Sequence, residues 1–115
     1  MDHEDLISIT TVREGDATVV SPSGDIDLGR SPTLRTYLKE AQRDRPKRLI
    51  VDLGQVEYMD SSGVATLIEA LQISLKQDTS MVLCNIQDKV RSIFEIARLD
   101  SVFKIVPDLK SALEL

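Results

Sequence analysis

The sequence predicts an α/β fold in which the central strands of the sheet run parallel. The first observation is a near-continuous apolar run at residues 49–53, bounded by Pro46 and Gly54 and typical of a strand buried on both faces. The second is the apolar spacing after residue 60, which predicts one buried helix face. That face comprises Val64, Leu67, Ile68, Leu71 and Leu75. Strands and helices continue to alternate, which indicates right-handed crossovers between parallel strands.

The chain opens with a predicted β-hairpin. Residues 6–13 alternate imperfectly between apolar and polar, residues 14–16 supply a turn, and residues 17–20 form the second strand. Residues 21–24, Ser-Pro-Ser-Gly, are expected to break regular structure. Residues 25–27 follow as a short extended piece.

The first helix is predicted to begin at Ser31, which has the side chain of an N-cap, with Pro32 at the first helical position. It ends near Asp44, before Pro46. Its expected apolar face consists of Leu34, Tyr37, Leu38 and Ala41.

The carboxy-terminal half predicts a strand, a helix, an edge strand and a short helix. The buried strand covers residues 81–85 and the edge strand residues 102–106. The helix between them has Val90, Ile93, Phe94 and Ala97 on its apolar face. The terminal helix carries Leu109, Ala112 and Leu113.

Composition bounds the class of protein. With 115 residues, 42% hydrophobic and 29% charged, the chain fits one domain at residues 1–115. A net charge of −5 argues against nucleic-acid binding. The single Cys84, in an apolar run, predicts a buried thiol in a reducing compartment. No apolar stretch is long enough to cross a membrane, and the acidic start is unlike a signal peptide, so we expect a cytoplasmic protein without membrane insertion.

The residues predict no enzyme. The only histidine is His3, in the amino-terminal tail, and Ser61 lacks the Gly-x-Ser-x-Gly setting of a nucleophile. Phosphate-binding glycine loops and metal-ligand spacing are absent, so we expect no cofactor and no metal. A receiver-type magnesium site on Asp25, Asp27 and Asp60 is an alternative, but a receiver would open with a β-α unit.

An acid and two hydroxyls, Asp60, Ser61 and Ser62, stand where the central helix begins. Such side chains accept hydrogen bonds from the backbone N–H groups that have no partner within a helix. Capping needs only one of the three, and Ser62 is the expected cap. Ser61 is then either another capping residue or a hydroxyl with a different role.

These residues resemble a known family. Residues 58–64, Tyr-Met-Asp-Ser-Ser-Gly-Val, resemble the signature of the STAS domain of bacterial anti-sigma-factor antagonists. Weaker resemblances lie at residues 24–27, 90–94 and 102–105. The resemblance implies a mixed sheet of about four to five strands with its helices packed mainly on one side.

The resemblance also implies a function. Ser61 would be phosphorylated by an anti-sigma factor with a histidine-kinase-like ATPase fold, and a separate phosphoserine phosphatase would reset it. Unphosphorylated protein, expected to be a monomer, would bind the anti-sigma factor and release a sigma factor. The residues expected to contact the partner are Asp25, Asp27, Asp60, Ser62 and Gly63.

Two alternatives use the same fold. Small STAS proteins also serve as accessory subunits of ABC-type phospholipid-transport systems, where the hydroxyl need not be phosphorylated. Residues 64–67, Val-Ala-Thr-Leu, depart from the Gly-Leu-Gly common in sporulation-type antagonists, which keeps this alternative open. A stress-signalling scaffold with a different kinase is the third interpretation.

Overall fold

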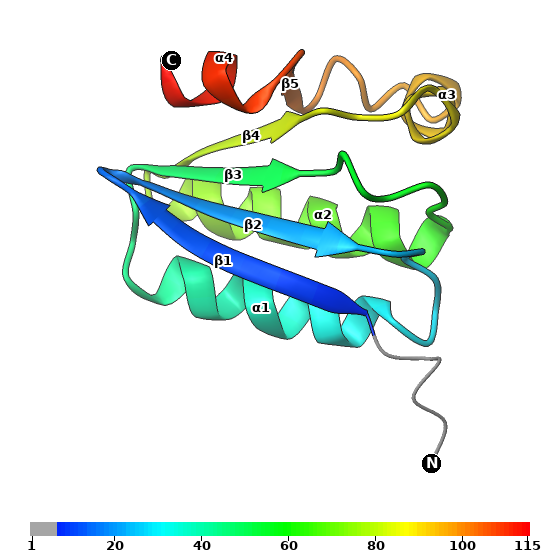
Figure 1. Cartoon of the computed structure of the whole chain (residues 1–115), viewed down its shortest axis with the longest axis horizontal. Helices are drawn as coiled ribbons and strands as arrows, with labels where there is room; N and C mark the ends of the chain where they lie inside the picture. The colour runs from blue at the N-terminus through cyan, green and yellow to red at the C-terminus, as the bar shows by residue number, and fades with distance from the viewer. Residues whose placement is uncertain (1–6) are drawn as a thin grey trace.

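The structure is a computed structural model that describes residues 7–115. His3, which the sequence places in the amino-terminal tail, lies outside the described residues. Five strands and four helices follow one another along the described chain (Figure 1). They are β1 (Ser8–Glu14), β2 (Ala17–Ser23), α1 (Ser31–Arg43), β3 (Arg48–Asp52), α2 (Ser61–Lys76), β4 (Ser80–Cys84), α3 (Asp88–Ile96), β5 (Lys104–Val106) and α4 (Leu109–Leu113).

The strands form one mixed sheet in the order β1-β2-β3-β4-β5. β1 and β2 pair antiparallel, with Val12 opposite Val19. The other neighbours pair parallel, so that Ile50 of β3 lies between Val19 of β2 and Val82 of β4. The prediction of a mixed sheet with parallel central strands is therefore confirmed. The opening hairpin differs from the β-α unit of a receiver domain.

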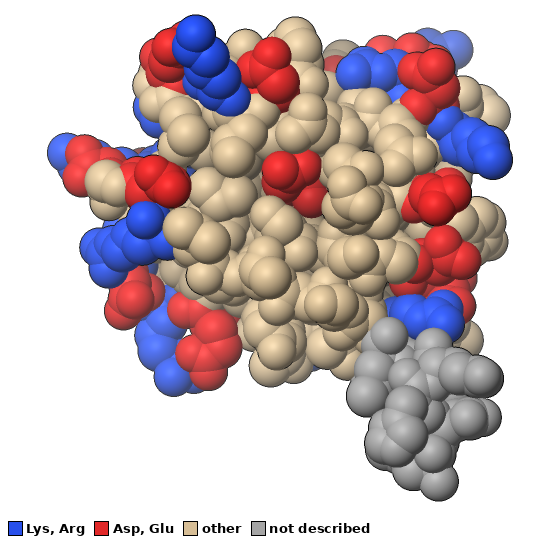
Figure 2. All heavy atoms as spheres, viewed as in Figure 1, with Lys and Arg blue, Asp and Glu red and all other residues tan. Residues whose placement is uncertain are grey.

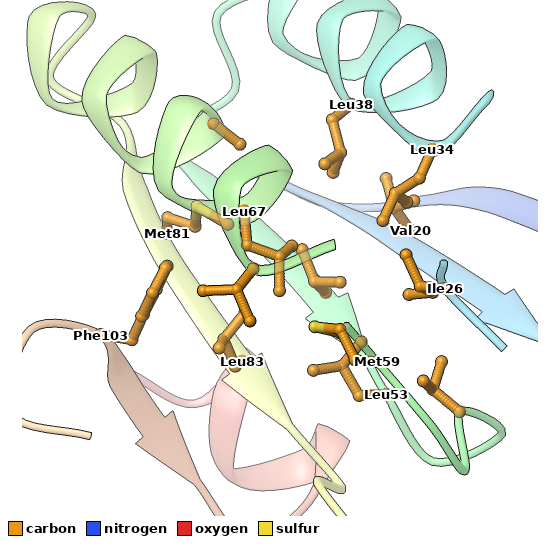
Figure 3. Close-up of a cluster of buried hydrophobic side chains, with 14 of the residues drawn as sticks. Val20, Ile26, Leu34, Leu38, Leu53, Met59, Leu67, Met81, Leu83 and Phe103 are labelled. Carbon is orange, nitrogen blue, oxygen red and sulfur yellow. The ribbon is translucent and has the colours of Figure 1, made fainter. Parts of the chain in front are cut away.

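Most of the helices pack on one face of the sheet. α1 and α2 lie side by side against it (Figure 1), and the larger buried cluster, which also includes Val90 and Phe94 of α3, fills the space between helices and strands. In Figure 3 Leu34 and Leu38 of α1 and Leu67 of α2 point into this cluster. α4 alone packs against the smaller cluster on the other face. This arrangement confirms that the helices lie mainly on one side.

The apolar faces of the helices are narrower than the sequence predicts. Tyr37 in α1 is 41% exposed and Leu75 in α2 is 66% exposed, although their neighbours Leu38 and Ser74 are buried, so each lies to the side of the buried face of its helix. Ala97 follows the last residue of α3 as its C-cap and is exposed. The buried stripe between α1 and α2 instead includes the polar Gln42, whose amide donates to the Ala70 carbonyl and the Ser74 hydroxyl at 2.8 and 2.9 Å.

Residues 21–24 do not break β2 as predicted. The strand continues to Ser23, and Pro22 pairs with Ile9 of β1. Proline is tolerated because the parallel register with β3 ends at Val20, so the missing N–H removes no hydrogen bond of that ladder.

The other strands differ from prediction mainly at their ends. β4 stops before Asn85, which adopts a positive φ of 55°, and β5 begins two residues after Val102, whose side chain is 53% exposed. Cys84 is buried as predicted, and burial raises its thiol pKa to about 12. No helix among residues 7–115 is both long and apolar enough to cross a membrane.

Candidate partner-binding site at the start of α2

Two loops at the carboxyl ends of β2 and β3 continue the parallel pairing of these strands. The N–H of Gly24 donates to the Gln55 carbonyl and that of Ile26 to the Tyr58 carbonyl, each at 3.0 Å. The N–H of Asp60 returns a hydrogen bond to the Ile26 carbonyl at 3.1 Å. These bonds hold residues 24–28 beside the segment that leads into α2.

The pairing decides which side chains face outward. Ile26 and Met59 form a parallel bridge and are both buried. Because side chains alternate along extended backbone, the neighbours of Ile26 and of Met59 point the opposite way. Sequence-predicted residues from both loops, with Tyr58, therefore share one outward face. They are Asp25, Asp27, Tyr58 and Asp60.

Asp60 caps α2 and also ties the two loops together. Its Oδ1 accepts from the N–H groups of Ser62 and Gly63 at 2.9 and 3.3 Å and from the Ser62 hydroxyl at 2.5 Å. Its Oδ2 accepts from the N–H of Leu28 at 3.1 Å. The Ser62 hydroxyl, followed by the backbone donors, lowers the pKa of the Asp60 carboxyl. The prediction that Ser62 is the cap is wrong, since Ser62 acts as a donor to the capping carboxylate.

Ser61 is the first residue of α2 and its side chain is exposed. Within residues 7–115 its hydroxyl makes no hydrogen bond, because the carboxylate of Asp60 occupies the backbone donors that a capping serine would use. The structural role that could have explained Ser61 is therefore filled by its neighbour. A free hydroxyl at the surface of a helix N-terminus is sterically open to another protein's active site.

Gly63 lies where α2 meets the β2–α1 loop, and it is buried. A Cβ atom there would be 2.6 Å from Met59 Cγ and 2.8 and 3.0 Å from Ile26 Cγ2 and its carbonyl oxygen. Only glycine lets the helix approach this closely. The start of α2 is thus fixed against the two loops by packing as well as by hydrogen bonds.

Asp27 organises a turn at residues 27–30. Its Oδ1 accepts from the N–H of Arg30 at 3.1 Å, its Oδ2 pairs with the Arg30 guanidinium at 2.6 Å, and its carbonyl accepts from the N–H of Ser31 at 2.8 Å. Arg30, rather than the predicted Ser31, is the N-cap of α1, and it makes no side-chain cap bond. Asp27 supplies the acceptors that a capping side chain would have offered.

Exposed side chains of two kinds lie on the two joined loops next to Ser61. Leu28 is 75% exposed and Tyr58 50%, while Asp25 and Glu57 are exposed acids. Figure 2 shows acidic side chains along the end of the molecule where the β2–α1 and β3–α2 loops lie. We call the outward side of residues 24–30 and 55–61 the Ser61 surface. Among residues 7–115, no group of three or more histidine, cysteine or acidic side chains is placed to hold a metal ion.

The family follows from comparison with known proteins. The model of the STAS domain matches residues 8–112, nearly the whole described chain. The chain belongs to the STAS domain family. The match includes both loops of the Ser61 surface and the start of α2.

Relatives of this STAS domain include named regulators. An anti-sigma-B factor antagonist of Listeria monocytogenes is 28% identical over 93 residues, 81% of this chain and 82% of the relative. One of Staphylococcus aureus is 24% identical over 99 residues, 86% and 92% of the two chains. The crystal structure of an anti-sigma factor antagonist from Mycobacterium paratuberculosis has a TM-score of 0.88 at 26% identity, covering 99% of this chain and 97% of that one.

In this STAS domain the predicted site residues gather at one end, though in different roles. Ser61 and Asp25 present exposed side chains, Asp27 and Asp60 are half-buried acceptors, and Gly63 is buried. Sequence analysis missed Leu28 and Tyr58. Tyr58 could have been found from its position next to the buried Met59, whereas nothing local to Leu28 predicts its exposure.

Proposed function

We propose that this STAS domain is an anti-sigma-factor antagonist whose affinity for its anti-sigma factor is switched by phosphorylation of Ser61. The observation that carries the proposal is the exposed Ser61 hydroxyl, which makes no hydrogen bond within the described chain while Asp60 caps the helix. The unphosphorylated form binds the anti-sigma factor and frees a sigma factor in the cytoplasm. The antagonist names of the relatives support this role.

The switch acts on binding rather than on folding. A phosphate on Ser61 adds about −1.5 to −2 charges. Its attraction to the helix N-terminus is only about 0.3–1 kcal/mol, and repulsion from Asp60 offsets part of it, so a domain stable by roughly 5–15 kcal/mol keeps its fold. Like charges across an interface cost several kcal/mol, and each 1.4 kcal/mol lowers affinity tenfold. One phosphate is therefore sufficient to release a partner.

The partner performs the chemistry. It holds ATP in a histidine-kinase-like fold. The Ser61 oxygen bonds to the γ-phosphorus while the bond from that phosphorus to the β-phosphate oxygen breaks, ADP leaves, and the hydroxyl proton passes to a base of the partner. A separate phosphoserine phosphatase restores the hydroxyl. The STAS domain contributes the acceptor and the surface around it, and no catalytic group.

The test is labelling of the purified full chain by host-cell extract with [γ-³²P]ATP, followed by mass spectrometry of the modified residue. We expect wild type and Ser62→Ala to be labelled at position 61 and Ser61→Ala to remain unlabelled. Ser62 is the matched control because it is the adjacent serine of the same helix turn. An unlabelled wild type, or equal labelling of Ser61→Ala, would contradict the proposal.

Binding is tested separately once the labelling kinase has been purified from the extract. Isothermal titration should give a dissociation constant at least about tenfold larger for the Ser61-phosphorylated protein than for the unphosphorylated one. Equal affinities would mean that phosphorylation does not control binding. Capture of a transport ATPase, together with absent labelling, would favour the ABC-type transport alternative.

A further inference from the structure

Leu28 and Tyr58 are exposed in a way that packing within the chain does not explain. A single exposed leucine is ordinary on a protein surface. Here, however, an exposed leucine and an exposed tyrosine, 75% and 50% accessible, stand on the two loops that hold the phosphoacceptor. The two loops are joined by hydrogen bonds on both sides of Ile26. Both side chains therefore belong to the same surface as Ser61.

The backbone under both residues is held in place. The N–H of Leu28 is bound by Asp60, and the turn that contains it is closed by Asp27, whose carbonyl and carboxylate both accept from the N–H of Arg30. The carbonyl of Tyr58 accepts from the N–H of Ile26 at 3.0 Å. An apolar side chain on a fixed backbone loses little conformational entropy when a partner covers it. Tyrosine is also enriched among the residues that dominate binding energy.

Charge indicates what kind of surface fits here. The exposed Glu57 precedes Tyr58 in sequence, and the exposed Asp25 lies on the loop that pairs with the Tyr58 segment. Arg30 is the only basic residue within residues 24–30 and 55–61, and its side chain pairs with Asp27. Figure 2 shows acidic groups at this end of the molecule, with basic groups also visible above and below them. A complementary surface is apolar in the middle and basic at its rim.

We infer that Leu28 and Tyr58 are the apolar anchors by which the kinase that modifies Ser61 docks, in an apolar depression of the kinase bordered by Lys or Arg side chains. The inference rests on the proposed function, since it takes Ser61 to be the phosphoacceptor. It adds the residues that supply affinity for the kinase, apart from the hydroxyl that receives the phosphate. The acidic rim at Asp25 and Glu57 steers the encounter.

The experiment measures the initial rate of Ser61 labelling against substrate concentration, with host-cell extract and [γ-³²P]ATP as the probe. Leu28→Ser and Tyr58→Ser should each raise the apparent KM at least about tenfold and leave the rate at saturation within about twofold. Leu28→Met and Tyr58→Phe should restore a KM close to that of wild type, because they retain the apolar body of the side chain.

Two exposed apolar residues away from the Ser61 surface serve as matched controls. Leu75 lies near the other end of α2, roughly 21 Å along the helix from Ser61, and Tyr37 lies on α1. Leu75→Ser and Tyr37→Ser should leave the apparent KM within about twofold of wild type. Equal KM changes in these controls would mean a general loss of folding and would overturn the inference, so thermal unfolding of each variant is recorded alongside.

Charge reversal tests the rim. Glu57→Lys should raise the apparent KM, and more so at low than at high salt, whereas Glu114→Lys in the carboxy-terminal segment should not. If the KM of Glu57→Lys does not depend on salt, the inference that the kinase surface has a basic rim is wrong.

The remaining outcomes separate the inference from the proposed function. If wild type is labelled but Leu28→Ser and Tyr58→Ser keep the wild-type KM, the anchors are wrong and the phosphorylation switch stands. If wild type is not labelled at all, the proposed phosphorylation switch is wrong, and so is the docking role of Leu28 and Tyr58 that rests on it. If Leu28→Ser instead changes the sedimentation coefficient of the purified protein, the surface binds a second copy of the chain and the inference is overturned.

Discussion

The carboxylate of Asp60 accepts a hydrogen bond from the backbone N–H of Leu28, 32 residues earlier in the chain, at 3.1 Å. Its other oxygen caps α2 through Ser62 and Gly63. One side chain therefore sets both the start of the helix that carries Ser61 and the position of the neighbouring loop. A change at Asp60 should disturb the presentation of Ser61 even where Ser61 itself is intact.

Replacing Asp60 by alanine should lower the free energy of unfolding by about 1–3 kcal/mol. Loss of a helix cap costs about 0.5–2 kcal/mol, and the N–H of Leu28 loses a charged acceptor as well. Urea unfolding measures the change. Asp60→Asn is the matched variant, because it keeps a capping oxygen without the charge and should lose less. A free energy of unfolding for Asp60→Ala within 0.5 kcal/mol of wild type would contradict the bridging role.

The Asp60 carboxyl should make stability depend on pH in the acid range. Its pKa is lowered in the folded protein by the Ser62 hydroxyl and the backbone donors, so the folded state binds a proton less readily than the unfolded chain. Its contribution is therefore fully present above the unfolded pKa near 3.9 and is lost as pH falls through the lower folded value.

Wild type and Asp60→Asn, unfolded in urea at a series of pH values, give the measurement. The stability advantage of wild type should be constant near neutral pH and should shrink below about pH 4. Carboxyl ¹³C shifts of Asp60 report its titration directly. A folded pKa at or above the ordinary aspartate value would show that the hydrogen bonds to Asp60 do not form in solution.

Gly63→Ala should destabilise the protein by up to about 2 kcal/mol, although alanine favours helices. The new Cβ would lie 2.6 Å from Met59 Cγ and 3.0 Å from the backbone oxygen of Ile26, and such overpacking costs about 1–3 kcal/mol against a propensity gain near 1 kcal/mol. Gly29→Ala is the control, since its Cβ would meet only the Asp27 carboxylate at 3.7 Å. Thermal and urea unfolding should separate the two variants, and equal stabilities would refute the close approach.

The fold was predictable because its signals are local. The apolar run of β3, the spacing of Val64 and Leu67 in α2, and the turn between β1 and β2 each lie within a few residues of the structure they specify. Parallel pairing of the central strands then follows from the alternation of strands and helices. The errors concern how wide the buried face of a helix is, which tertiary packing decides. Tyr37 and Leu75 have the right spacing but are exposed, beside the buried Leu38 and Ser74.

The sequence predicts where the candidate site lies, but it does not predict which of its residues caps the helix. Asp60, Ser61 and Ser62 all have side chains able to cap α2, and only three-dimensional contacts assign the cap to Asp60. The hydrogen bond from Leu28 to Asp60 joins loops that are far apart in sequence, so no local sequence pattern predicts it. Gln42 is a similar case: it is buried between α1 and α2, where the Ala70 carbonyl and the Ser74 hydroxyl accept hydrogen bonds from its amide nitrogen.

The two adjacent serines should behave oppositely in stability and in modification. Ser62→Ala removes the hydroxyl that donates to Asp60 at 2.5 Å, so it should cost about 1 kcal/mol in urea unfolding and raise the pKa of Asp60. Ser61→Ala removes an exposed hydroxyl without a hydrogen bond among residues 7–115, and its free energy of unfolding should stay within about 0.5 kcal/mol of wild type. A larger loss for Ser61→Ala than for Ser62→Ala would return Ser61 to a structural role and remove the main support for phosphorylation at that residue.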